Sequence, residues 1–149
     1  MKLTNKTLYT ITKPVTFEDP RELELLSVDM MKCMDSNKGV GLAANQVGLD
    51  ISLFVTNIEG NYSAFFNPKI LQLSEYMVEF EEGCLSFPDE YHIIKRPESV
   101  KIEYQDYLGN TTRKELEGLE CRVWLHEYDH LQGITFQQYK EDENTDVKE

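Results

Sequence analysis

The segment from His126 to Gly133 constrains this chain more than any other. It reads His-Glu-Tyr-Asp-His-Leu-Gln-Gly, so two imidazoles stand four residues apart and a carboxylate follows the first. On an α-helix, residues four apart lie on one face, one turn above the other. Two neutral imidazoles placed in this way can bind one divalent metal ion, and Glu127 then stands where it can move a proton of a bound water. The segment therefore predicts a helix that supports metal-assisted hydrolysis.

Length and composition indicate one globular unit. The chain has 149 residues, 40% of them hydrophobic, and no apolar run approaches the roughly 20 residues that span a bilayer. The first residues lack the apolar stretch of a signal peptide, and three cysteines do not make a disulfide framework, so we expect an intracellular protein. The net charge of −12 argues against direct binding of nucleic acid or of an anionic membrane. We expect one catalytic domain over residues 1–139 and an acidic, flexible tail over residues 140–149.

The spacing of apolar residues predicts two helices among several strands. A capping signal and an early proline at residues 16–20 precede a helical pattern that ends at Gly39, and a second helix is expected over residues 118–131. We expect the Asn67-Pro68 pair to end one of the strands. The strands are expected at 51–56, 62–66, within 71–80, at 99–105 and at 111–116. The fold class is therefore α+β, with mainly antiparallel strands packed around a C-terminal helix that carries the metal motif.

Two imidazoles alone hold a catalytic metal poorly, because such sites usually take three protein ligands and leave one position for water. One class of metalloprotease places a third histidine where this chain has Phe136. No histidine or cysteine follows His130 in the sequence. We therefore expect the third ligand upstream, where the candidates are His92, Cys84, Cys121 and several acidic residues.

The surroundings of these candidates differ. Cys121 lies five residues before His126, so on one helix the two side chains point to different sides. His92 has no local feature that fixes it. Cys84 follows Gly83, which permits close approach of the backbone, and it precedes a bend that a serine and a proline mark. A thiolate beside a divalent metal is deprotonated at neutral pH, so Cys84 can serve as a ligand, but the residues alone leave the choice among these candidates open.

Three segments of the chain, taken together, resemble the peptide deformylase family. Residues 39–46 resemble its Gly-φ-Gly-φ-Ala-Ala-x-Gln motif, residues 82–86 its Glu-Gly-Cys-Leu-Ser motif, and residues 126–133 its His-Glu-x-x-His motif with the adjoining Leu and Gly. The three segments occur in the family's order. The resemblance implies a deformylase-type fold and an enzyme that removes the N-formyl group from formyl-methionine at the N-terminus of newly made polypeptides, releasing formate.

The resemblance also implies a role for each motif. Glu127 would accept a proton from the attacking water and deliver it to the leaving amine. The side-chain amide of Gln46 and the backbone N–H of Leu85 would stabilise the negative charge that builds on the formyl oxygen. The implied metal ligands are Cys84, His126 and His130.

Four further residues are candidates for binding the substrate. Small residues of the first motif, Gly41 among them, would let the substrate backbone lie along this segment as an added strand, although a tight loop explains them equally well. Val40 and Val123 are candidate walls of the methionine pocket, although ordinary core packing is nearly as good an explanation. Gly83, next to the proposed ligand cysteine, is the fourth candidate.

One divalent metal ion is expected as the cofactor. A mixed Cys/His₂ donor set suits Zn²⁺, Fe²⁺, Co²⁺ or Ni²⁺, and the family resemblance favours Fe²⁺. The expected partners are a formyl-methionyl peptide or nascent polypeptide and, transiently, the ribosome. We expect no partner among nucleic acids or membranes. The expected location is the cytoplasm, or the host cytoplasm or an organelle if the source is viral or organellar.

The sequence also leaves alternatives and departures. Many family members carry an arginine where this chain has Tyr91, and many continue into a longer C-terminal helix. Asp129 could contact a ligand histidine or serve a structural role, and Arg96 could pair with Glu82 behind the Cys84 loop. The alternative functions are a His-Glu-x-x-His metallopeptidase and an inactive, metal-binding module of deformylase type.

Overall fold

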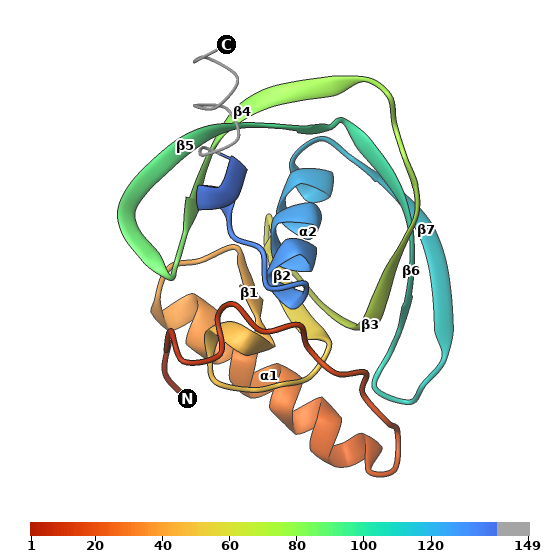
Figure 1. Cartoon of the computed structure of the whole chain (residues 1–149). Helices are drawn as coiled ribbons and strands as arrows, with labels where there is room; N and C mark the ends of the chain where they lie inside the picture. The colour runs from red at the N-terminus through yellow and green to blue at the C-terminus, as the bar shows by residue number, and fades with distance from the viewer. Residues whose placement is uncertain (140–149) are drawn as a thin grey trace.

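A computed structural model describes residues 1–139, so the predicted tail at 140–149 lies outside the described residues. The elements follow one another in the order that Figure 1 labels: α1 (Pro20–Ser36), β1 (Gly41–Ala43), the short 3-10 helix η1 (Ala44–Gln46), β2 (Leu53–Ile58), β3 (Asn61–Leu73), β4 (Met77–Cys84), β5 (Phe87–Pro97), β6 (Ser99–Gln105), β7 (Thr111–Glu117) and α2 (Gly118–Leu131). No helix within residues 1–139 is long and apolar enough to cross a membrane.

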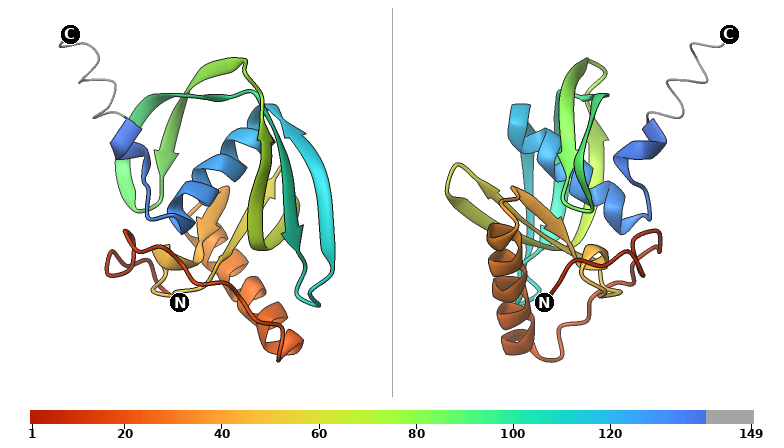
Figure 2. Two further views of the ribbon diagram at one scale, coloured as in Figure 1. Left: turned by 45° about the vertical axis from the view of Figure 1, so that its right-hand side comes forward. Right: turned by 90° about the vertical axis from the view of Figure 1, so that its left-hand side faces the viewer.

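Two antiparallel sheets surround α2. Five strands pair in the order β1-β2-β3-β6-β7, and β4 pairs with β5 in a separate two-stranded sheet. Figures 1 and 2 show α2 in the middle of the molecule, with the long β4–β5 hairpin arching over it and α1 on the opposite side of β1 and β2. The arrangement agrees with the predicted fold class and brings the β4–β5 turn close to the C-terminal half of α2.

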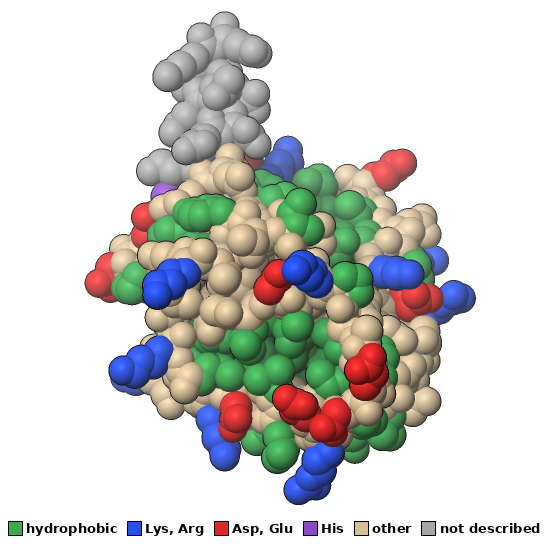
Figure 3. Space-filling view, turned by 60° about the horizontal axis from the view of Figure 1, so that its bottom comes forward, with side chains coloured by type: hydrophobic (Ala, Val, Ile, Leu, Met, Phe, Trp, Pro, Cys, Tyr) green, Lys and Arg blue, Asp and Glu red, His purple; other side chains and the backbone are tan. Residues whose placement is uncertain are grey.

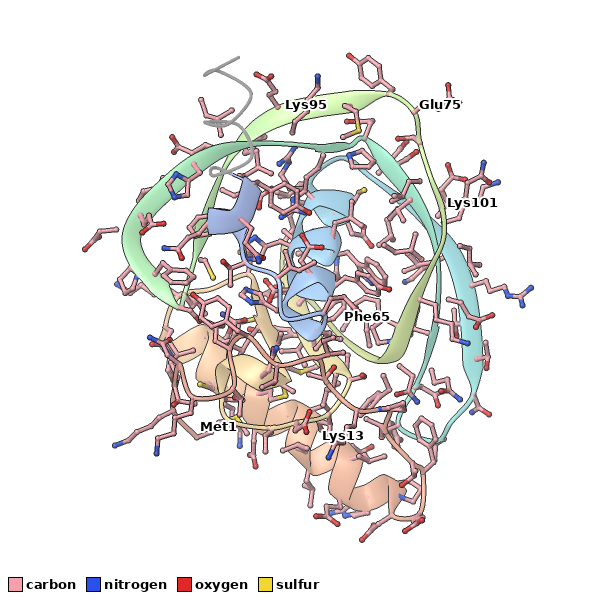
Figure 4. The ribbon with its side chains drawn as sticks, in the orientation of Figure 1. Met1, Lys13, Phe65, Glu75, Lys95 and Lys101 are labelled. Carbon is pink, nitrogen blue, oxygen red and sulfur yellow. The ribbon has the colours of Figure 1, made fainter. Side chains whose placement is uncertain are left out.

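Packing fixes the rotation of α2 about its axis. Trp124 meets the rings of Phe54 and Phe65 edge-on at centroid distances of 5.4 and 6.2 Å, and it stacks on Tyr128 at 5.3 Å. Figure 4 shows Phe65 beside α2, whereas Lys95 lies at the outer edge of the molecule. Residues two apart on a helix differ by about 200°. Burial of Trp124 in the sheet therefore turns His126 toward the opposite side, where the β4–β5 turn lies.

A second apolar cluster lies between α1 and the first strands. Asp19 caps α1 by accepting a hydrogen bond from the Glu22 N–H at 3.2 Å, and Met30 and Met34 are fully buried. The helix begins where the sequence predicts, but it ends at Ser36 rather than at Gly39. On the face of the molecule that Figure 3 shows, apolar side chains are visible between charged ones.

The prediction that Asn67-Pro68 ends a strand is wrong, because β3 continues through this pair to Leu73. Asn67 adopts φ 49° and lies where the pairing of β3 with β6 shifts register. Its side chain accepts a hydrogen bond from the Val15 N–H at 2.7 Å and donates one to the Val15 carbonyl at 3.0 Å. These contacts stabilise a bulge, and the bulge accommodates a proline that has no N–H to donate.

Candidate metal centre and active site

Three side chains converge between the end of β4 and α2. One ligand atom each from Cys84, His126 and His130 lies within 4.8 Å of the others. Cys84 Sγ is 3.4 Å from His130 Nε2. The two histidines occupy successive turns of one helix face, as their spacing predicts, and the cysteine arrives from the sheet. One thiol and two imidazoles are a donor set that suits a divalent transition metal with an open fourth position.

The surroundings of the two imidazoles differ. Burial alone would lower the pKa of His126, but hydrogen bonds with Cys84 and Glu82 raise it to about 10, so metal binding would displace a proton from this ring. The Nδ1–H of His126 donates to Glu82 Oε1 at 2.8 Å, so its Nε2 is left free as a ligand. Burial alone would raise the pKa of Glu82, but hydrogen bonds from His126 and Arg96 lower it to about 2. Burial lowers the pKa of His130 well below its usual value, which keeps this imidazole neutral. A neutral imidazole is the form that binds a metal.

Glu82 is the centre of a buried charge cluster. Arg96 donates to its two oxygens at 2.6 and 3.0 Å, which is the pairing that the sequence left open. Arg122 donates to Glu82 Oε2 at 2.5 Å and also to the backbone carbonyl of Ile94 at 3.0 Å. Sequence reasoning missed Arg122. Its position four residues before His126, on the same face of the helix, was the signal that could have revealed it.

Replacing Arg96 by alanine should lower the free energy of unfolding by about 3–5 kcal/mol, because it leaves the buried Glu82 carboxylate without its bidentate partner. Arg113→Ala is the matched control. Arg113 pairs with Glu103 at 2.9 Å with a side chain that is 73% exposed, so its loss should cost less than about 1 kcal/mol. Urea denaturation of both variants at one saturating metal concentration measures the difference. Equal losses would contradict the importance of the buried pair.

The other residues that the sequence offered as ligands or partners lie elsewhere. Cys121 Sγ lies 3.5 Å from the carbonyl of Pro97, and burial raises the pKa of this thiol to about 11. His92 pairs with Glu90 at 2.7 Å. Asp129 accepts hydrogen bonds from Arg96 and Tyr139.

Glu127 lies beside the candidate ligands. Its Oε2 is 4.0 Å from His126 Nε2, and its Oε1 has no hydrogen-bond partner within residues 1–139 although it is buried. Burial raises the pKa of Glu127 to about 7, near the value that suits proton transfer at neutral pH. The approach of this side chain requires Gly41, because a Cβ at that position would lie 2.5 Å from Glu127 Oε2.

The first motif places Gln46 on the other side of the thiol. The N–H of Ala43 donates to Gln46 Oε1 at 2.9 Å, which fixes the orientation of the amide. The amide nitrogen therefore faces the site, where it is 3.7 Å from Cys84 Sγ and donates to Ser86 Oγ at 2.9 Å. Leu85 follows the cysteine in the β4–β5 turn, and it lines a cavity together with Gln46 and Cys84. The fixed amide can donate a hydrogen bond to a developing oxyanion.

Two adjoining cavities open onto these groups. The larger, of about 650 Å³, is lined by Val40, Gly41, Gly83 and Tyr91 among others. The smaller, of about 140 Å³, brings Val123 together with Val40 and Gly83. Tyr91 lies against Gly83, where a Cβ would come within 2.9 Å of its ring. All four substrate-contact candidates therefore border a cavity next to Glu127.

The family model described as polypeptide deformylase matches residues 1–145. The chain belongs to this family. Peptide deformylase from Treponema pallidum (strain Nichols) is 41% identical over 129 residues, which cover 87% of this chain and 79% of the relative. The chloroplastic peptide deformylase 1B of Oryza sativa subsp. japonica is 42% identical over 126 residues, 81% of this chain, but the match covers only 46% of the length of that relative.

A solved deformylase confirms the predicted fold class. The peptide deformylase structure from Thermotoga maritima superposes with a TM-score of 0.88 at 35% identity, covering 93% of this chain and 97% of that one. Deformylases are metal-dependent hydrolases that act on nascent formyl-methionyl polypeptides. The family resemblance seen in the three sequence motifs is therefore confirmed, and a cluster of Cys84, His126 and His130 able to hold a metal accompanies it.

Proposed function

We propose that this chain is a peptide deformylase that removes the N-formyl group from formyl-methionine at the start of new polypeptides and releases formate. The observation that carries the proposal is the convergence of Cys84, His126 and His130 within 4.8 Å, with the Glu127 carboxylate next to them. Residues 1–139 would form the catalytic domain.

The donor set supports one divalent metal ion as cofactor. We propose Fe²⁺ in the native protein, because the family resemblance favours it. Zn²⁺, Ni²⁺ or Co²⁺ would replace it, because a thiolate and two imidazoles accept all of these ions. When bound, the ion would lower the pKa of a water molecule and so supply a nucleophile at neutral pH.

The surrounding residues would carry the rest of the reaction. Glu127 accepts a proton from the attacking water on its carboxylate and delivers it to the departing amine nitrogen, while the formyl carbon leaves as formate. The amide of Gln46 and the backbone N–H of Leu85 donate hydrogen bonds to the negative charge on the formyl oxygen.

The two cavities supply the substrate contacts. The substrate backbone would lie along the segment that contains Gly41, in the cavity that Gly83 also lines, and the methionine side chain would enter the smaller cavity between Val40 and Val123. The natural substrate would be a nascent chain in the cytoplasm, host cytoplasm or organelle, reached during transient contact with the ribosome.

Two alternative functions would use the same site, namely a metallopeptidase and an inactive, metal-binding module. One experiment distinguishes both of them from deformylation. The purified, metal-loaded protein is incubated with formyl-Met peptides and with unformylated peptides, and formate and new amino termini are both measured. Deformylation predicts formate and one free methionine amine per peptide. New termini inside unformylated peptides would instead show a metallopeptidase. Release of neither product from several formyl-peptides would show an inactive, metal-binding module.

A further inference from the structure

We propose that Asp129 and Tyr139 are positioning residues for the metal centre. They act on it through a chain of polar contacts that is partly buried at Tyr139 and Asp129 and ends on the buried imidazole of His126. The inference rests on the proposed function, because it takes the Cys84, His126 and His130 cluster to be a metal site.

The chain of contacts is continuous from the end of the described residues to the candidate ligand. Tyr139 Oη donates a hydrogen bond to Asp129 Oδ2 at 2.7 Å, and the same oxygen accepts one from Arg96 Nη1 at 2.9 Å. Arg96 then donates to both oxygens of Glu82, at 2.6 and 3.0 Å. Glu82 Oε1 in turn accepts the Nδ1–H of His126 at 2.8 Å. The guanidinium is therefore held by a carboxylate on each side.

Asp129 balances the charge of this cluster. Glu82 carries one negative charge but contacts two guanidinium groups, those of Arg96 and Arg122. Asp129 supplies the second carboxylate and makes the four side chains neutral as a group. Its side chain is only 16% exposed, and that of Arg96 is 3% exposed. Without Asp129, an uncompensated positive charge would lie behind a cation site in a region of low dielectric, where charge repulsion is strong.

Tyr139 constrains the orientation of the Arg96 guanidinium. Its ring centre lies 4.8 Å from Arg96 Cζ, and its hydroxyl oxygen is 3.4 Å from Arg96 Nη1. The ring covers the guanidinium, while the hydroxyl orients the Asp129 carboxylate. The donors of an arginine form a rigid planar fork, so a rotation of Arg96 would disturb both of its bonds to Glu82. Glu82 holds the ring of His126 and selects its tautomer, which tunes the affinity of a ligand histidine.

The rate of metal release tests the proposal without relying on activity. The full chain is loaded with Co²⁺, and a chromogenic chelator in excess removes the ion. Asp129→Asn should release Co²⁺ about tenfold faster than the wild type, because loss of an outer partner of a ligand commonly weakens metal binding by about 10–100-fold. Tyr139→Phe keeps the ring but loses the hydrogen bonds of its hydroxyl with Asp129 and Arg96, so about threefold is expected. Wild-type rates in both variants would overturn the proposal.

Gln137→Ala is the matched control. Gln137 Nε2 donates to Glu90 at 2.9 Å, so this variant loosens the same C-terminal stretch without removing a contact to Arg96. Its release rate should equal that of the wild type. If Gln137→Ala accelerates release as much as Tyr139→Phe, general anchoring of the segment explains the effect and the proposal is overturned.

A ligand variant distinguishes failure of this proposal from failure of the proposed function. Cys84→Ala should lose most of the bound Co²⁺ and the charge-transfer absorption that a thiolate ligand gives. Retention of both would refute the assigned ligand set, and the positioning roles would fall with it. Their loss, together with wild-type release rates in Asp129→Asn and Tyr139→Phe, would refute the positioning roles alone.

Discussion

Glu127→Gln should lower kcat for formate release by about 10²–10⁴-fold and leave the metal content unchanged, because it removes a proton acceptor without removing a ligand. The amide is nearly the same size as the carboxylate and fits the same space beside Gly41. Steady-state kinetics on a formyl-Met peptide, with metal analysis of the same sample, measures both quantities.

Glu120→Gln is the control for this substitution. Glu120 lies in the first turn of the same helix, is exposed and lines neither cavity, so the change removes the same charge outside the site. Its kcat should match that of the wild type. Wild-type turnover in Glu127→Gln, or an equal loss in both variants, would contradict the role of Glu127 in proton transfer.

Gln46→Glu should lower kcat by about 10²–10³-fold, the usual cost of losing one donor to an oxyanion. Glutamate keeps the oxygen that accepts the Ala43 N–H, so the local fold is retained. It replaces the donating –NH₂ group by an oxygen that repels the developing negative charge. Stopped assays under saturating substrate isolate kcat from substrate binding.

The control for Gln46→Glu is the same substitution at Gln72, an exposed position on β3. That variant should retain wild-type kcat. A Gln46→Glu enzyme with unchanged kcat and a raised KM would contradict oxyanion stabilisation, because it would show that Gln46 only helps to bind the substrate.

The helix of the site could be predicted because the residues that define it lie close together in the sequence. The spacing of His126 and His130 determines which face they share, and the buried Trp124 two residues earlier determines where that face points. The third ligand lies 46 positions before His130, so the helix pattern could not identify it. Spacing alone left His92 and Cys121 as alternatives, and the family resemblance was needed to favour Cys84 over them.

The features that the sequence did not reveal depend on contacts between distant segments. The passage of β3 through Asn67-Pro68 depends on hydrogen bonds to Val15, which is 52 residues away. The strand β5 was not predicted, and it is defined by its pairing with β4. The contact of Arg122 with Glu82 joins residues 40 positions apart. Periodicity within a short window carries no information about such pairs.

We propose that one divalent ion, held by Cys84, His126 and His130, drives deformylation in this chain. The most direct measurement removes the metal anaerobically, adds Fe²⁺ back in steps, and follows formate release from a formyl-Met peptide. We expect no release without metal and a rise that saturates at one equivalent per chain, with no recovery in Cys84→Ala. Full activity in the metal-free protein, or full recovery in Cys84→Ala, would contradict it.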